Sequence, residues 1–266
     1  MILPALPLFL GLLVLVYSED DEEIEADKCR NATMGGTPLD IKEAPWTASV
    51  VIKEKAKCSG VIYSMEYIIT AAKCVDGFTT KAVRVRVGSS TRSSPDAAVC
   101  NIIVHEKFSE LNTPYNVALL KLCSPLTASN TIKQIQLVDK FPADNTKVLS
   151  TGWPSFRWWS LFWEQCLDGL AQQMMSAEVK MSGRKTCMKN WPKQNQLGRN
   201  ITNDMFCTEK AGNEACSFDL GSPLALKGKL VGILARGGCS RRPDVYTNLL
   251  KYKTWLAKNS KQLNHS

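Results

Sequence analysis

Histidine is nearly absent from this chain of 266 residues, which has only His105 and His265. None of its cysteines form a Cys-x-x-Cys pair. Structural zinc sites are built from closely spaced cysteine and histidine ligands, so this shortage argues against a metal site. The sequence also contains no nucleic-acid-binding motif and nothing that indicates a cofactor. We therefore expect neither metal, cofactor nor nucleic acid.

Long hydrophobic runs are also scarce. After residue 18, no stretch stays apolar for the roughly 18 residues that a membrane-spanning helix needs. Residues 1–18 carry no charged side chain, and their apolar core at residues 3–16 is followed by the small Ser18. This pattern is typical of a signal peptide, with a short membrane anchor as the alternative because a basic start is missing. We expect a secreted, extracellular protein with no membrane span after signal removal.

Basic residues are missing from residues 19–27, where seven of the nine side chains are acidic. The formal charge of the whole chain is +8, so residues 28–266 carry +15. We predict a solvated acidic segment at residues 19–32, too charged to fold alone. The basic remainder favours acidic partners such as sulfated glycans, anionic protein surfaces or that segment itself. The alternative is that scattered lysines only confer solubility.

Cysteine, in contrast, is plentiful. Ten cysteines in a secreted chain indicate disulfides rather than metal ligands. Three Asn-x-Ser/Thr sequons, at Asn31, Asn200 and Asn264, predict N-glycosylation, as is usual for secreted proteins.

Strand-like patterns dominate the chain. Residues 83–88 alternate Val-Arg-Val-Arg-Val before a glycine, as in a half-buried strand, and residues 47–53 and 102–105 are further strand-like runs. Near the end, Trp255 and Leu256 lie at helical spacing from Tyr252. We predict an all-β protein with one helix over residues 252–260 and a tail at residues 261–266.

Three separate stretches are distinctive. Residues 70–74 read Thr-Ala-Ala-Lys-Cys, residues 115–122 read Tyr-Asn-Val-Ala-Leu-Leu-Lys-Leu, and residues 216–223 read Cys-Ser-Phe-Asp-Leu-Gly-Ser-Pro. In this order they resemble three signatures of the trypsin-like (chymotrypsin-like) serine proteases: Thr-Ala-Ala-His-Cys, Asn-Asp-Ile-Ala-Leu-Leu-Lys-Leu and Cys-x-Gly-Asp-Ser-Gly-Gly-Pro. Three ordered signatures make the resemblance specific.

The resemblance covers residues 33–260, nearly the whole mature chain. It implies two packed six-stranded antiparallel β-barrels followed by a C-terminal helix. We expect the barrels at about residues 33–145 and 146–250.

The residues that carry the chemistry differ from the family pattern. The resemblance places Leu220 at the nucleophile, Lys73 at the general base and Asn116 at the carboxylate that orients the base. Leucine has no atom that can attack a carbonyl. A lysine is charged at neutral pH unless buried, and an amide cannot stabilise an imidazolium as a carboxylate does. Phe218 replaces the glycine of the oxyanion hole. We therefore predict that the protein is not an enzyme.

Three functions from different classes follow. The first is a catalytically inactive homologue that binds proteins as a cofactor, decoy or scaffold, as insect-type homologues do in haemolymph and reproductive fluids such as seminal fluid. The second is a serine endopeptidase with relocated chemistry, for which Ser217 and Ser222 are the nearest candidates. The third is a glycosaminoglycan-binding module driven by the basic charge. We expect His105, which lies far in sequence from residues 70–74, to be structural.

The acid that precedes the nucleophile position matches Asp219. In active relatives, cleavage after a basic residue creates a new amino terminus that is buried against this acid. Here Ala32 precedes the matching start at Thr33, and the nearest basic residue, Arg30, lies two positions earlier. We expect conventional activation to be blocked. The alternative is that Arg30 is still cut and the new terminus stays on the surface.

The specificity pocket is altered as well. The resemblance places Glu214 at its base, Asp244 where a glycine normally leaves it open, and Arg236 and Gly237 on the strand that lines it. Two carboxylates in one small cavity raise a pKa or demand a cation. We expect Arg236 to fill the pocket from inside. The alternative is an open pocket that accepts a basic side chain without hydrolysis.

The resemblance also implies disulfides. Three pairs match family bridges: Cys58–Cys74, Cys187–Cys207 and Cys216–Cys239. We pair Cys100 with Cys123 because their strands should be neighbours in the first barrel. Cys166 resembles a family cysteine that reaches toward the N-terminus, so we pair it with Cys29.

One stretch has no family counterpart. Residues 154–163 carry five aromatic side chains, among them Trp158, Trp159 and Trp163. Exposed apolar patches often mark a protein partner's binding surface. The rings either form such a surface or fold back onto the barrel, and the sequence leaves both open.

Overall fold

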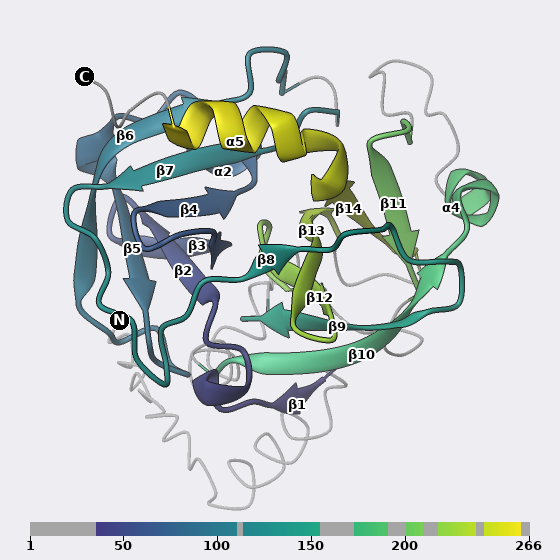
Figure 1. The fold of residues 1–266 in the computed structure, drawn as a ribbon, viewed down its shortest axis with the longest axis horizontal. Coiled ribbons are helices and arrows are strands. Elements are labelled where there is room, and N and C mark those ends of the chain that lie inside the picture. The colour runs from purple at the N-terminus through teal and green to yellow at the C-terminus, as the bar shows by residue number, and fades with distance from the viewer. Residues whose placement is uncertain are drawn as a thin grey trace, which may run out of the picture. The chain divides into compact units, whose positions relative to one another are not determined.

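Two closed barrels of antiparallel strands account for most of the described chain (Figure 1). The computed structural model describes residues 36–110, 114–154, 173–190, 201–209, 218–237 and 242–261. The all-β prediction with a C-terminal helix is confirmed. Within these ranges, no helix combines the length and the apolar character that crossing a bilayer requires.

The first barrel is closed by pairing of its first strand with its fourth in the chain. Its interior is filled by buried side chains such as Val50, Ile68, Val85 and Leu120. Alternation explains why β5 forms, since its valines point inward and its arginines outward. In the order of the sheet, the strands are β2 (Thr47–Ile52), β3 (Lys55–Ile62), β4 (Tyr67–Thr70), β7 (Ala118–Leu122), β6 (Asp96–Val104) and β5 (Val83–Val87).

The second barrel closes in the same way, through pairs that β9 makes with both β10 and β12. Its core contains Phe206, Leu224 and Tyr246, and the Tyr246 hydroxyl lies 3.0 Å from the Ser150 hydroxyl. In the order of the sheet, the strands are β9 (Lys147–Gly152), β10 (Met175–Ser182), β11 (Met205–Thr208), β14 (Asp244–Asn248), β13 (Lys229–Arg236) and β12 (Pro223–Leu226).

Two short strands that precede residue 145 pair with strands of the second barrel. β1 (Thr37–Pro38) pairs with β10, and β8 (Gln136–Leu137) pairs with β13, so both belong to the sheet of the second barrel. β8 also runs parallel to its neighbour, which departs from an all-antiparallel sheet. Each short strand uses backbone groups at strand ends that the barrel leaves unpaired. A two-residue strand has no hydrophobic period, so the sequence could not reveal it.

The two barrels share an apolar interface. Val61, Ile69 and Leu119 of the first barrel pack with Leu230 and Ile233 of the second. The same cluster includes buried residues of the C-terminal elements η3 (Leu249–Tyr252) and α5 (Lys253–Lys261). α5 runs over β7 of the first barrel (Figure 1), so the chain leaves the second barrel and its last helix packs against the first. The helix extends one residue beyond its predicted end.

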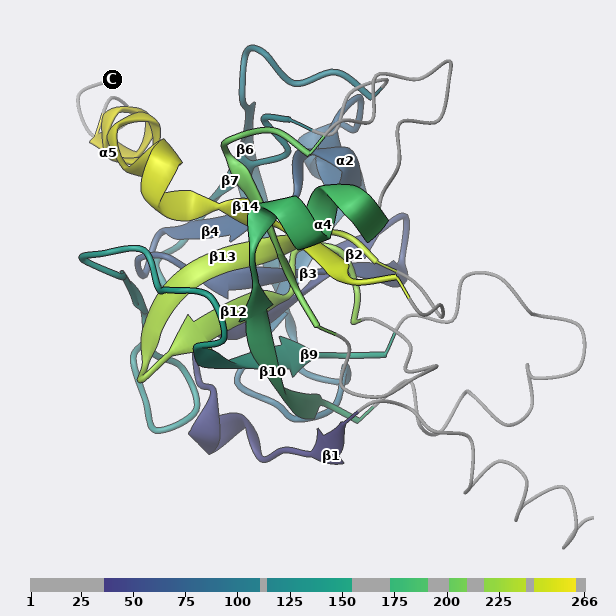
Figure 2. The ribbon, with the colours of Figure 1, turned by 90° about the vertical axis from the view of Figure 1, so that its right-hand side faces the viewer.

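Two helical turns and two helices were not predicted: η1 (Ile41–Glu43), α2 (Ala72–Val75), η2 (Thr80–Ala82) and α4 (Arg184–Asn190). α4 lies beside β11, on the side of the second barrel that faces the viewer in Figure 2.

Three predicted disulfides are present. Cys58–Cys74, Cys100–Cys123 and Cys187–Cys207 form, with Cα–Cα distances of 6.3, 4.9 and 5.6 Å. The other two predicted pairs, Cys216–Cys239 and Cys29–Cys166, lie outside the described residues. Because Cys100 and Cys123 lie on or just after neighbouring strands, their bridge fastens β6 to the end of β7.

Removing this bridge should destabilise the first barrel. The double variant Cys100→Ala/Cys123→Ala is expected to lose about 3 kcal/mol in the free energy of unfolding, because the bridge closes a loop of 23 residues in the unfolded chain. Urea denaturation under non-oxidising, non-reducing conditions measures this loss. Thr127→Ala, an exposed neighbour, is the control. A loss no larger than that of the control would contradict the prediction.

Candidate functional site

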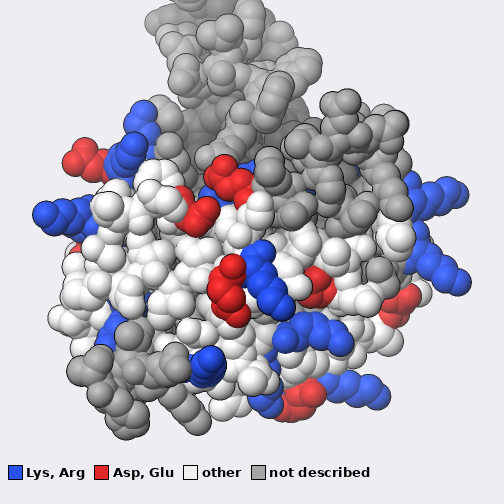
Figure 3. Space-filling view, turned by 90° about the horizontal axis from the view of Figure 1, so that it is seen from above, with Lys and Arg blue, Asp and Glu red and all other residues white. Residues whose placement is uncertain are grey.

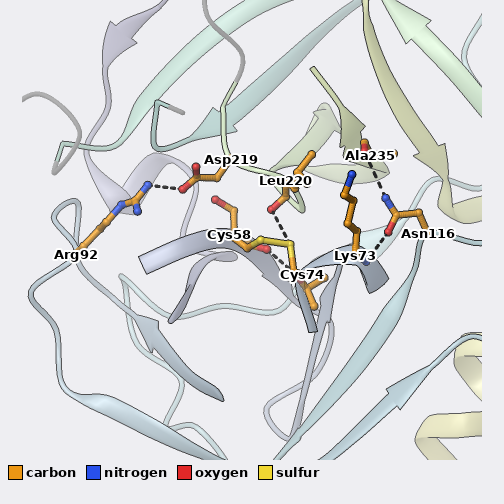
Figure 4. The surroundings of a disulfide bond; sticks show 10 residues. Cys58, Lys73, Cys74, Arg92, Asn116, Asp219, Leu220 and Ala235 are labelled. Carbon is orange, nitrogen blue, oxygen red and sulfur yellow. Dashed lines mark hydrogen bonds and ion pairs between the residues drawn. A yellow bond between two sulfur atoms is a disulfide. The ribbon is translucent and has the colours of Figure 1, made fainter. Parts of the chain in front are cut away.

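The three positions that match the catalytic triad meet where the two barrels touch (Figure 4). Lys73 lies on α2, Asn116 lies just before β7, and Leu220 lies in the loop before β12. In Figure 4 the Lys73 side chain extends between Leu220 and Asn116 toward Ala235 on β13. The fold therefore brings Lys73, Asn116 and Leu220 close together.

Asn116 acts as a tie between the barrels. Asn116 is buried, with a relative exposure of only 2 %. The amide oxygen accepts a hydrogen bond from the Lys73 backbone N–H at 2.9 Å, and the amide nitrogen donates to the Ala235 carbonyl at 3.3 Å. A neutral amide can both accept and donate, which a carboxylate cannot. Asn116 therefore joins α2 of the first barrel to β13 of the second.

Lys73 presents a solvated cation. The residue is exposed, and no described residue forms an ion pair with it. Its hydrogen bond to Asn116 is made by its backbone N–H, so the described residues give the side chain no fixed polar partner. The side chain instead adds one positive charge where the two barrels meet.

The loop around Leu220 keeps a fixed backbone. The Leu220 carbonyl accepts from the Ser59 backbone N–H at 2.8 Å, and its half-buried side chain packs against the core of the first barrel. Gly221 has a φ of +86°, and an added Cβ would lie 2.1 Å from the Ser59 carbonyl oxygen. Only glycine fits this position without strain. The turn is thus set by glycine and hydrogen bonds rather than by a reactive group.

Phe218 is part of the apolar core of the second barrel. It is buried among the core residues of the second barrel, next to Leu224 and Val231. Its φ is not in the left-handed region that favours glycine. The residue that replaces the oxyanion-hole glycine therefore fills space in the core.

Ser222, a candidate for relocated chemistry, has no exposed surface. Its hydroxyl has no hydrogen-bond partner among the described residues and packs against Gly152, where an added Cβ would lie 2.2 Å from it. Its backbone N–H donates to the Asp219 carbonyl, and its own carbonyl accepts from the Leu234 N–H. A substrate cannot reach this hydroxyl. The other candidate, Ser217, lies outside the described residues.

Asp219 forms an ion pair that sequence reasoning missed. Its carboxylate pairs with the guanidinium of Arg92, and the two side chains are 7 % and 9 % exposed. The guanidinium also lies over the Trp153 ring, 5.5 Å from its centroid. A buried carboxylate that is not paired with an amino terminus needs another cation as its partner. The sequence alone cannot identify that partner, because the chain has 33 lysines and arginines. Only the fold shows which one is used.

The residues of the predicted pocket are only partly described. Asp244 is buried on β14, Arg236 is half-buried on β13, and Gly237 is exposed. An irregular register places Arg236 opposite Val245, the neighbour of Asp244. Glu214 lies outside the described residues, so an occluded pocket stays a prediction. Asn31, Asn200 and Asn264, and Trp158, Trp159 and Trp163, also lie outside them.

His105 belongs to an aromatic cluster under α5. Its ring stacks on Tyr115 and Trp255, with centroid distances of 4.9 and 5.0 Å. Its Nδ1 accepts from the Lys107 backbone N–H at 3.2 Å, as a neutral imidazole can. Burial lowers the pKa of His105 from its ordinary value of 6.5, although Glu106 acts in the opposite direction. These contacts are those of a structural residue.

Comparison with known proteins agrees with this geometry. A family model described as "Trypsin" matches residues 33–256. The chain belongs to the trypsin family. Among its relatives, hypodermin-B of Hypoderma lineatum is 34 % identical over 233 residues, covering 86 % of this chain and 87 % of that protein. Trypsin iota of Drosophila melanogaster is 29 % identical over 252 residues, covering 93 % and 94 %.

Solved structures show the same trypsin fold. The scabies mite inactivated protease paralogue S-D1 matches with a TM-score of 0.74 and 25 % identity, covering 86 % of this chain and 97 % of that one. Mouse neuropsin matches with a TM-score of 0.71 and 23 % identity, covering 85 % and 99 %. The second similarity concerns the fold alone.

Loss of the Asn116 amide should loosen the contact between the barrels. Asn116→Ala removes both hydrogen bonds and leaves the groups they joined unpaired, so the free energy of unfolding should fall by about 1–3 kcal/mol. Chemical denaturation measures the loss. Asn130→Ala, at an exposed asparagine, provides the matched control. Equal stability of the two variants would show that the Asn116 hydrogen bonds do not stabilise the contact between the barrels.

His105 should make the fold less stable in acid. Because burial lowers its pKa below 6.5, the unfolded chain binds a proton more readily than the folded one. Its stabilising contribution is then complete above pH 6.5 and is lost as the pH falls toward the folded-state pKa. The free energy of unfolding measured from pH 7 to pH 5 should fall less in His105→Phe than in the wild type. Identical slopes would contradict this assignment.

Proposed function

We propose that this member of the trypsin family is a secreted, non-catalytic homologue that acts by binding protein, as a cofactor, decoy or scaffold. The observation that carries the proposal is Leu220. It stands at the nucleophile position of a loop whose glycine turn and hydrogen bonds are intact. The loop therefore keeps its shape while lacking an attacking atom.

Magnitudes support the absence of catalysis. In a protease with this type of triad, loss of the nucleophile or base costs on the order of 10⁶ in kcat. Loss of one oxyanion donor costs about a further 10²–10³. Lys73, Asn116 and Phe218 supply none of the missing roles, because the first is solvated, the second is a structural tie and the third is in the core.

Relocated chemistry has little support. Ser222 is fully buried and faces Gly152 rather than the seam between the barrels, so it has no route to a peptide bond. The similarity to structures described as inactivated protease paralogues of the scabies mite also favours a non-catalytic role.

Binding fits the architecture. A rigid framework of two barrels joined by an apolar interface holds the connecting loops in place, and loops on rigid scaffolds commonly carry recognition. On the face shown in Figure 3, basic and acidic side chains of the described residues are interspersed. Such a mixed surface suits a protein partner better than a polyanionic glycan.

Secretion belongs to the same proposal. Residues 1–18 have the pattern of a signal peptide, and the described residues contain three disulfides, which persist in oxidising compartments.

The purified mature protein should neither react with a serine-directed probe nor hydrolyse a peptide substrate. We expect no covalent adduct with a fluorophosphonate probe by intact-mass spectrometry and no turnover of a peptide ester above the buffer rate, because Leu220 offers no hydroxyl. Active trypsin at the same concentration is the positive control. An adduct or turnover that disappears in Ser222→Ala would establish relocated chemistry and overturn the proposal.

A further inference from the structure

The buried carboxylate of Asp219 needs a positive partner. Leaving one charge alone in a protein interior is strongly unfavourable, and a carboxylate beside the core of the second barrel is such a case. In this chain the partner is the side chain of Arg92, which lies 127 residues earlier. The cation is therefore covalently present in every molecule, whether or not the chain is cut.

We propose that Arg92 is a built-in counter-ion that orders residues 218–222 without a newly formed amino terminus. The protein thus reaches its working conformation as an uncut chain. This inference goes beyond the proposed function, because it concerns how the loop is held and not what the protein binds.

Arg92 is held in position before it meets the acid. It lies in the turn between β5 and β6, where the Arg86 guanidinium donates to the Arg92 carbonyl at 2.8 Å. The Ser90 carbonyl in the same turn accepts hydrogen bonds from the Met174 backbone N–H at 2.7 Å and from the Trp153 indole N–H at 3.3 Å. The turn is thus fastened to both barrels, and Figure 4 shows the arginine reaching from it to Asp219. Little entropy remains to be lost when the ion pair forms.

The loop on the other side is equally connected. The Asp219 N–H donates to the Trp153 carbonyl at 2.9 Å, and the Gly221 N–H donates to the Leu234 carbonyl at 2.8 Å. The Ser222 N–H returns to the Asp219 carbonyl at 3.1 Å. These bonds hold the backbone on both sides of the buried carboxylate, so we expect the Arg92 charge to affect the order of the whole turn.

A second cation has no favourable route to the same carboxylate. An ammonium group that arrived there would face the Arg92 guanidinium, and like charges in a poorly solvated site repel. The residue that precedes Thr33 is also Ala32 rather than a basic residue. Cutting at Arg30 should therefore leave the loop unchanged.

Hydrogen exchange of the amides at residues 218–222, read by mass spectrometry on the full mature chain, tests the proposal. Two forms are compared: the uncut Arg30→Gln variant and the wild type cut at Arg30, with the cut verified by its new terminus. Their exchange rates should agree within about twofold. Slow exchange that appears only in the cut form would overturn the proposal.

The charge is tested with Arg92→Met, which keeps an unbranched side chain but removes the cation. Exchange at residues 218–222 should accelerate at least about tenfold, because the carboxylate loses its partner. Lys147→Met is the matched control, since Lys147 forms an exposed ion pair with Glu178 in the second barrel. It should change the rate less than about twofold. Unchanged exchange in Arg92→Met would contradict the proposal.

A paired substitution separates charge from packing. In Arg92→Met/Asp219→Asn no charge is left buried, so exchange should return to within about threefold of the wild type. A double variant as fast as Arg92→Met would refute an electrostatic cause. Should Arg92→Met fail to fold, the comparison of the cut and uncut forms with Arg92 intact decides the question. No readout depends on catalysis or partner binding, so the outcome is separate from that of the proposed function.

Discussion

A buried charge is the constraint on which the rest of the site depends. Asp219 is buried in the loop before β12, and its carboxylate forms an ion pair there with Arg92, from a turn of the first barrel. The Arg92 guanidinium lies over the Trp153 ring, and the Trp153 backbone carbonyl accepts a hydrogen bond from the Asp219 N–H. This ion pair therefore joins a turn of the first barrel to the loop that carries Leu220, in addition to the apolar interface and the Asn116 hydrogen bonds.

The site shows how a catalytic geometry can persist as structure. Asn116 uses its amide to join two backbone groups on opposite barrels, and Gly221 allows a turn that would strain any other residue. Leu220 adds apolar contact to the core of the first barrel. These interactions stabilise the fold through hydrogen bonds, a glycine turn and apolar packing alone.

Prediction from the sequence succeeded where a local pattern determines structure. β2, β5 and β13 are long enough for apolar residues to mark them, and the helix near Trp255 shows helical spacing. Prediction failed for β1 and β8, because two-residue strands are defined only by pairing with their neighbours. It also missed β12, whose first residue, Pro223, is the last residue of the motif at residues 216–223. Positions in the site were found by motif. Their contacts were not, since the hydrogen bond between Asn116 and Ala235 joins residues 119 positions apart in the chain.

What the sequence by itself determined is the chemistry that each position lacks. A leucine side chain at residue 220 has no oxygen in any fold. The cysteines favour bridges over metal ligands, and three predicted bridges form among the described residues. Only the tertiary structure decided which charge meets which. Arg92 carries no motif, and its partner is fixed by burial and proximity that exist after the two barrels have packed. Electrostatic partners depend on distance and solvation, and neither quantity is written along the chain.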